Sequence, residues 1–237
     1  MMKESGRDPG FDSRAAVTRS LLGWGVLVGP IYLTVGLTLA LTRDGFSLSE
    51  HQLSLLMLGD NGWIQSANLI LSGVLTWVAA YGFARAMAGT SSGRWTAILL
   101  AVFGAGLVGS GNFPPDPMAG FPPGVESGDA TASGLLHLIL GAVGFIVLAI
   151  ATFVAATWMR ARGDLHWASY SRASGIVVLA GFLGGAALSQ QAIGVVLLWV
   201  AVVAGYAWIA ATSVYLWRTV PHPDAHRREA TGTPAGT

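Results

Sequence analysis

Long apolar stretches separated by short polar segments dominate the pattern of this chain. An α-helix needs about 20 apolar residues to cross the roughly 30 Å hydrocarbon core of a bilayer. Six stretches reach or approach this length: Leu21–Thr42, Trp63–Ala84, Trp95–Asn112, Ser133–Met159, Ala173–Leu188 and Ala192–Trp217. The pattern therefore predicts an all-α integral membrane protein, with one domain over residues 21–218 that forms a six-transmembrane-helix bundle.

The boundary between the fifth and sixth spans rests on one short polar cluster. Residues 173–217 are otherwise almost continuously apolar, and a single helix of that length would extend about 68 Å at 1.5 Å per residue. The cluster Ser189-Gln190-Gln191 interrupts this run, so we expect a tight turn there. The fifth helix is then short.

Basic residues are distributed unequally between the two sides that six spans define. With the N-terminus in the cytoplasm, 12 of the 13 Lys and Arg residues fall on the cytoplasmic side and only Arg43 falls outside. Such an excess is characteristic of cytoplasmic loops. We therefore predict that both termini are cytoplasmic. The composition, rich in Ala, Gly, Arg and Trp, resembles that of a high-GC bacterium, so we expect a bacterial plasma membrane. The first span is too long for a signal-peptide core and no small-x-small cleavage site follows it, so we expect an uncleaved anchor.

Composition removes several classes of function. Hydrophobic residues make up 53% of the 237 residues and charged residues 11%, against about 25% charged residues in soluble domains. The net charge of +1 provides no basic field for nucleic acid. Cysteine is absent, which excludes disulfides, thiolate nucleophiles and Cys-ligated metals. We expect membrane lipids as partners, no nucleic acid and no cofactor.

Two long loops are expected on the outer side, and a polar tail at each end of the chain. The first loop contains Ser47-Leu48-Ser49-Glu50, a capping box that predicts a short helix through about Leu58, lying on the membrane or packed on the bundle. The second loop, residues 113–132, holds five of the ten prolines, which predicts a stiff, extended lid. The tails, residues 1–20 and 219–237, are expected to be disordered.

Polar side chains concentrate in the outer half of the predicted spans. Four of them form one stripe at helical spacing on the second helix, and the others lie near the outer ends of later helices. They are Gln65, Asn68, Ser72, Thr76, Ser110, Asn112, His137 and Gln190. Amide side chains in hydrocarbon need partners, so we infer an outward-facing polar pocket, roofed by the Pro-rich loop. Separate interhelical hydrogen bonds without a cavity are the alternative.

His137 is the one ionisable residue within a predicted span. Gly134, Gly141 and Gly144 share its helical face, so His137 is expected to point into the bundle. It is either a neutral, hydrogen-bonded core histidine or a ligand-binding, basic or pH-sensitive group. Asp116 lies between prolines at the rim, where pairing with His137, His51, Glu50 or Asp60 would form a metal site or an Asp–His general-base pair. An Asp beside proline is also a common turn residue.

Several short motifs together resemble an uncharacterised bacterial family of six-helix membrane proteins, domain of unknown function 998. The most specific match is Gly109-Ser110-Gly111-Asn112-Phe113-Pro114-Pro115-Asp116 followed by His137. The others are Gly23, Asp44-Gly45-Phe46-Ser47, Asn68, Ser72-Gly73 and Trp199. The resemblance runs from about Leu21 to Arg218 and implies the six-helix fold without an activity. The chain departs from the family at Asp44, where the family has Pro-Gly-Tyr-Ser, and at Gln191-Ala192, where it often has Gln-Arg.

Three functions fit these observations. The first is non-enzymatic binding of a lipid head group or small amphiphile, in sensing, scaffolding or transport; its candidate ligand-binding residues are His137, Asp116, Asn68, Gln65, Ser72, Ser110, Asn112 and Gln190. The second is a membrane-embedded, metal-dependent hydrolase that uses Asp116 and His137. The third is a structural subunit of a membrane complex, and the pairs Gly25–Gly29 and Gly181–Gly185 are compatible with such a partner or with a homo-oligomer. The first is preferred, with no catalytic or metal-binding residue assigned. Because no span carries Asp, Glu, Lys or Arg in its middle, a proton- or sodium-driven transporter is disfavoured.

Overall fold

The computed structural model describes residues 11–118, 120–125 and 130–225. These residues form six α-helices and one 3-10 helix, and contain no strand. The helices are α1 (Ser13–Thr42), η1 (Leu53–Met57), α2 (Gly62–Ala86), α3 (Ser91–Asn112), α4 (Ala132–Ala161), α5 (Leu165–Ala187) and α6 (Ala192–Thr219). The predicted all-α fold is confirmed.

Five of the six α-helices are long and apolar enough to cross a membrane, which indicates a multi-pass membrane protein. The exception is α5, whose first turns carry polar side chains that include His166, Ser169 and Arg172. At 23 residues it is long enough, so its composition, and not its length, sets it apart.

Two helices, α1 and α5, begin eight residues earlier than the sequence predicts. Residues 13–20, expected in a disordered tail, form the first turns of α1, where the carboxylate of Asp12 accepts the N–H of Ala15. The guanidinium of Arg19 stacks 3.4 Å from the ring of Trp217 and donates to the carbonyl of Val220. These contacts join the start of α1 to the end of α6 and hold it in a helix.

The start of α5, at Leu165, lies eight residues before the expected Ala173. Its early polar residues are accommodated because the bundle supplies hydrogen bonds. The hydroxyl of Ser171 is buried, donates to the carbonyl of Thr152 on α4 and accepts from the indole of Trp208 on α6. Apolar periodicity alone does not reveal such a satisfied polar helix.

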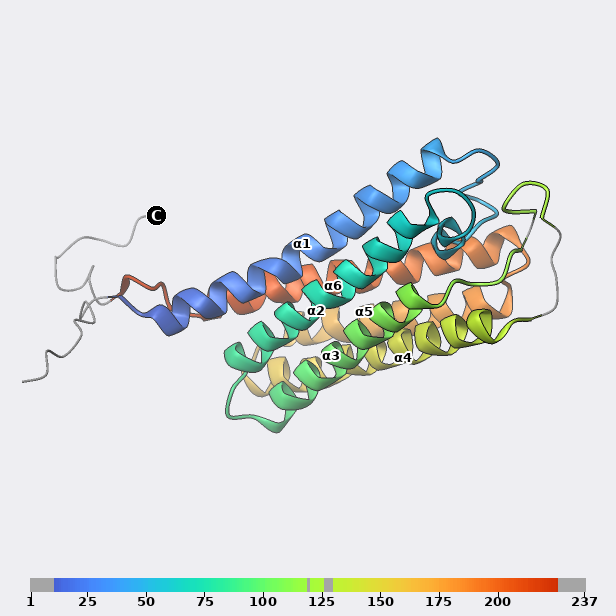
Figure 1. Ribbon diagram of the computed structural model, residues 1–237. Helices are drawn as coiled ribbons and strands as arrows, with labels where there is room; N and C mark the ends of the chain where they lie inside the picture. The colour runs from blue at the N-terminus through green and yellow to red at the C-terminus, as the bar shows by residue number, and fades with distance from the viewer. Residues whose placement is uncertain (1–10, 119, 126–129, 226–237) are drawn as a thin grey trace, which may run out of the picture.

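The six helices form a closed ring in chain order (Figure 1). Each packs against its neighbours in sequence, and α6 packs against α1. The loops that follow α1 and α3 lie at one end of the bundle, here called the loop end. Both ends of the described chain meet at the opposite, terminal end, where the N–H of Asp12 donates to the carbonyl of Pro223.

Glycines allow adjacent helices to approach closely around this ring. A Cβ at Gly73 of α2 would lie 2.5 Å from the carbonyl oxygen of Gly104 on α3. One at Gly181 of α5 would lie 2.9 Å from the carbonyl oxygen of Leu197 on α6. Small residues serve this purpose in membrane bundles, where packing drives helix association.

Candidate functional site

A cavity of about 140 Å³ lies inside the ring, in its loop-end half. All six α-helices and the η1 segment contribute to its wall. Among its lining residues, Tyr32 comes from α1, Leu69 from α2, Ser110 from α3, His137 from α4 and Phe182 from α5. The cavity is therefore a property of the whole bundle and not of one hairpin.

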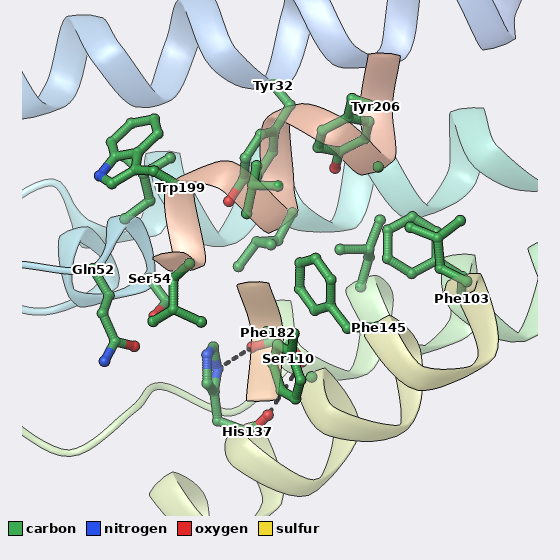
Figure 2. A pocket seen from close by; sticks show the side chains of 18 of the residues that line it. Tyr32, Gln52, Ser54, Phe103, Ser110, His137, Phe145, Phe182, Trp199 and Tyr206 are labelled. Carbon is green, nitrogen blue, oxygen red and sulfur yellow. Dashed lines mark hydrogen bonds between the residues drawn. The ribbon is translucent and has the colours of Figure 1, made fainter. Parts of the chain in front are cut away.

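The cavity has a polar end and an apolar end (Figure 2). Gln52, Ser54, Ser110 and His137 gather at one end. The opposite end is formed mostly by aromatic and aliphatic side chains, in which the rings of Phe145 and Phe182 stack 4.9 Å apart beside Phe103 and Leu148. The hydroxyl of Tyr206 points toward this end. Such an amphipathic interior differs from the mainly polar pocket that the sequence predicts.

The described lining of the cavity carries no Asp, Glu, Lys or Arg side chain, which decides the charge of a ligand that can bind there. Its hydrogen-bonding groups are an amide, hydroxyls, an indole and the imidazole of His137. A net-charged group placed here would remain without a counter-ion, at a high desolvation cost. The cavity therefore suits an uncharged ligand.

His137 is held by the carbonyl groups at the end of α3. Its Nδ1 lies 3.0 Å from the carbonyl oxygen of Ser110 and 2.8 Å from that of Phe113. The last carbonyls of a helix lack partners within it, so the imidazole serves as their donor from the neighbouring helix. Because both partners are acceptors, Nδ1 carries the proton, and Nε2 of the neutral ring keeps a lone pair for another donor.

The polar stripe of α2 lies beside the cavity and not in its wall. Gln65, Asn68 and Ser72 are buried, but α2 presents Leu69 to the cavity. The amide of Asn68 donates to the carbonyl of Tyr32, 3.1 Å away, and to Gln65 Oε1, 3.2 Å away. The alternative of an interhelical hydrogen bond therefore accounts for Asn68.

Tyr32 and Tyr206 line the cavity, with ring centroids 5.1 Å apart. The Tyr206 hydroxyl is buried next to Ser72, and the Tyr32 hydroxyl is buried next to Gln65.

Asp116 binds Thr131, the N-cap residue of α4, and does not pair with His137. Its carboxylate accepts the hydroxyl of Thr131 at 2.6 Å and the N–H of the same residue. Thr131 in turn caps α4 by accepting the N–H of Gly134. Within the described residues no hydrogen bond or ion pair joins Asp116 to His137, and no three His, Cys, Asp or Glu residues are grouped to hold a metal.

The remaining two predicted residues lie outside the cavity. Asn112 is exposed and donates to the carbonyl of Val108 on its own helix. Gln190 is exposed in the turn between α5 and α6. Ser110 and His137 are thus the members of the predicted set that line the cavity.

Among the described residues, the roof of the cavity comes from the first loop and not from the Pro-rich loop. Gln52, Leu53 and Ser54 line the cavity from this loop. The Pro-rich loop packs against the first loop. The ring centroids of Phe121 and Phe46 lie 5.2 Å apart, with the rings edge to face. The sulfur of Met118 also accepts from the Gln52 amide.

The predicted helix from Ser47 to Leu58 is shorter than expected. The N–H of Ser47 donates to Nδ1 of His51, so a turn replaces the first helical residues. Only Leu53–Met57 is helical, and it is a 3-10 helix. Its leucines are buried at Leu53, Leu55 and Leu56, which confirms packing on the bundle.

Sequence reasoning missed most of the lining residues. Tyr32, Phe145, Phe182 and Tyr206 lie in uninterrupted apolar runs, where an aromatic residue is as common in a packed core as in a cavity wall. Among these missed lining residues, only Trp199 had been singled out in the sequence, because it belongs to the motifs that resemble a known family.

Comparison with known proteins supports that resemblance. Residues 26–215 match the family described as protein of unknown function (DUF998). The chain belongs to the DUF998 family. The match runs from α1 to α6, and it includes every residue that lines the cavity. No curated protein and no solved structure matches the chain. Since the DUF998 description assigns no activity, the cavity must carry the argument about function.

Proposed function

We propose that the protein binds an uncharged amphiphile, such as a hydroxyl-bearing lipid, in the cavity of the bundle and performs no chemistry on it. The observation that carries the proposal is the combination of a polar end without charge and an apolar end in one cavity of the bundle. A hydroxyl group at the polar end would donate to Nε2 of His137 and meet the side chains of Gln52 and Ser54. The first methylene groups of the ligand would contact Phe145 and Phe182.

The size of the cavity agrees with part of such a ligand. At about 140 Å³ it resembles an engineered cavity of about 150 Å³ in another protein that accepts benzene. Burial of each methylene group contributes about 0.8 kcal/mol. A head group and a few methylene groups would fill the space.

We further propose that all six helices span a bacterial plasma membrane with both termini in the cytoplasm. The described Arg residues support this orientation, because Arg43 alone among them lies at the loop end. The cavity would then lie nearer the outer surface. The polar first turns of α5 would lie at the cytoplasmic interface, and its apolar remainder would cross the membrane.

The hydrolase alternative has less support. It requires Asp116 and His137 to act on one substrate or metal, but Asp116 is engaged by Thr131 and His137 by the end of α3. Neither contact supplies an activated nucleophile. Binding without catalysis is the simpler function for these residues.

Filling the cavity provides a direct test. A Cβ at Gly141 would have only Ser110 Oγ near it, at 3.9 Å, and one at Gly23 would have no atom within 4 Å. Gly141→Leu therefore fills the cavity, and Gly23→Leu is a matched control, also within a helix. Thermal unfolding in detergent is measured with and without a medium-chain monoacylglycerol. We expect the ligand to raise the Tm of the wild type and of Gly23→Leu, and to leave that of Gly141→Leu unchanged. An equal rise in Gly141→Leu contradicts the proposal.

A further inference from the structure

The internal cavity is too small for a complete lipid chain, so a bound amphiphile needs an exit for the rest of its chain. About 140 Å³ is close to the volume of the engineered cavity of about 150 Å³ that accepts benzene. An acyl chain of ordinary length exceeds this volume several-fold. This inference rests on the proposed function, because it concerns the path of the same ligand.

A second hollow lies on the outside of the bundle, between α1 and α6. It is an open groove of about 600 Å³, with Leu37 from α1, Leu48 from the first loop, and Val196, Val200 and Val203 from α6. These lining residues are all apolar, and α6 is long and apolar enough to span a membrane. The groove therefore faces the hydrocarbon of the bilayer, where an acyl chain is its natural occupant.

The groove exists because α1 leaves α6 toward the loop end. At Gly29 the two helices are close, since a Cβ there would lie 2.8 Å from Cβ of Tyr206. Nearer the loop end, Gly36 packs instead against the first loop. A Cβ added at Gly36 would lie 3.3 Å from a side-chain carbon of Leu53. Figure 1 shows this half of α1 separated from α6. Pro30 lies at the point of divergence, where proline removes a backbone donor and bends helices.

Trp199 connects the two spaces. Its side chain belongs to the lining of the internal cavity and also to that of the outer groove. It is half-buried on α6, and Figure 2 shows it beside Tyr32 at the edge of the cavity. Trp199 therefore borders both the amphipathic cavity and the apolar groove.

We propose that the space between α1 and α6 is a lateral portal, through which the acyl chain of the amphiphile passes Trp199 and lies in the groove. The head group stays at the polar end of the cavity, beside His137. The ligand would enter from the membrane and not from the aqueous side, where Gln52, Leu53 and Ser54 of the first loop roof the cavity.

Photo-crosslinking with two monoacylglycerol probes tests this path. One long-chain probe carries a diazirine close to the glycerol and the other carries it near the chain end, and both react with the full-length protein in vesicles of phosphatidylcholine. Peptide mapping is expected to place the first adduct on cavity residues such as Phe145 and the second on Leu37, Val200 or Val203. If the first probe labels the cavity and the second labels other helices, the portal is wrong and the binding proposal stands. If the first probe does not label the cavity, both proposals are wrong.

A matched pair of valines adds a functional measurement. Val200 in the groove and Val143 on α4 are similarly exposed, at 42% and 46%. Val200→Trp is expected to weaken binding of the long-chain monoacylglycerol about tenfold, the effect of losing two buried methylene groups, and to leave a short-chain analogue unaffected. Val143→Trp should change neither. Equal binding of the long chain by both variants would overturn the portal.

Discussion

At the scale of single residues, His137 combines a structural contact with a free acceptor. Its Nδ1–H is directed to the carbonyls of Ser110 and Phe113 at the end of α3, which ties α4 to α3 next to the cavity. Its Nε2 takes no part in that contact. The two roles that the sequence leaves open, a hydrogen-bonded core histidine and a ligand-binding group, are therefore compatible within one ring.

Two substitutions separate these roles. His137→Ala removes the donor to α3 and should lower the stability by about 1 kcal/mol, the typical contribution of a hydrogen bond. His137→Asn keeps an N–H near the position of Nδ1 and should lose less. Both remove Nε2, so both should bind a medium-chain monoacylglycerol about tenfold more weakly. Thermal unfolding and titration of the ligand measure the two effects; undiminished affinity of His137→Asn would exclude Nε2 as a ligand contact.

Asp116 shows why a residue type near a histidine does not define a site. In the sequence, Asp116 precedes His137 by about 20 residues and is expected on the same side of the membrane. That placement allows a metal site or an Asp–His general-base pair. The structure instead uses the carboxylate to hold Thr131, the N-cap of α4. The alternative, a turn residue beside proline, is closer to the observed contact. The separation of Asp116 and His137 along the chain did not indicate whether they would pair.

At the scale of helices, close packing at glycine sets the shape of the ring. A Cβ at Gly73 would approach both the carbonyl oxygen of Gly104 at 2.5 Å and a side-chain carbon of Val108 at 2.6 Å. Backbone cannot yield to such a contact without separating α2 from α3. The glycine content of the chain is thus a packing requirement at particular positions and not only a compositional feature.

Gly73→Ala should destabilise the bundle by about 1–3 kcal/mol, the usual range for overpacking. The matched control is Gly23→Ala, where an added methyl group meets no atom within 4 Å and the better helix propensity of Ala should be neutral or slightly favourable. The measurement is the thermal unfolding midpoint of both variants in the same detergent. A Gly73→Ala variant as stable as Gly23→Ala would show that α2 and α3 are less closely packed than described.

The helices were largely predictable from hydropathy, and their ends were not. Apolar runs located all six α-helices, and five of these helices are long and apolar enough to cross a membrane. The early starts of α1 and α5 depend on contacts with distant residues, such as Arg19 with Trp217 and Ser171 with Trp208. Local sequence does not contain those contacts.

At the scale of the whole molecule, the cavity was only partly predictable. Helical spacing correctly grouped Gln65, Asn68 and Ser72 on one face, but it could not show that Tyr32 and Tyr206 line the cavity while the stripe stays out of its wall. Which face of a helix meets a cavity depends on how all six helices pack. His137 and Ser110 were found because each is a polar residue within an apolar stretch, where a polar side chain is costly unless it has a hydrogen-bond partner or a function.

The orientation of the molecule can be measured because the chain has no cysteine. Ser49 lies exposed at the loop end and Ser91 exposed at the terminal end. In intact bacterial cells, a membrane-impermeant maleimide should label Ser49→Cys and should label Ser91→Cys only after lysis, as the positive-inside rule requires. The reverse pattern would place the cavity toward the cytoplasm. Labelling of both sites in intact cells would contradict the membrane-spanning arrangement.

The most direct test of amphiphile binding is native mass spectrometry of the protein purified from its membrane, followed by lipid extraction. Wild type and the matched Gly23→Leu control should retain one uncharged amphiphile per chain, and Gly141→Leu, whose new side chain fills the cavity, should retain none. Retention of the same molecule by all three proteins would place it on the outer surface of the bundle. That result, or a wild type that carries nothing beyond bulk lipid, would contradict the assignment of the cavity as a ligand site.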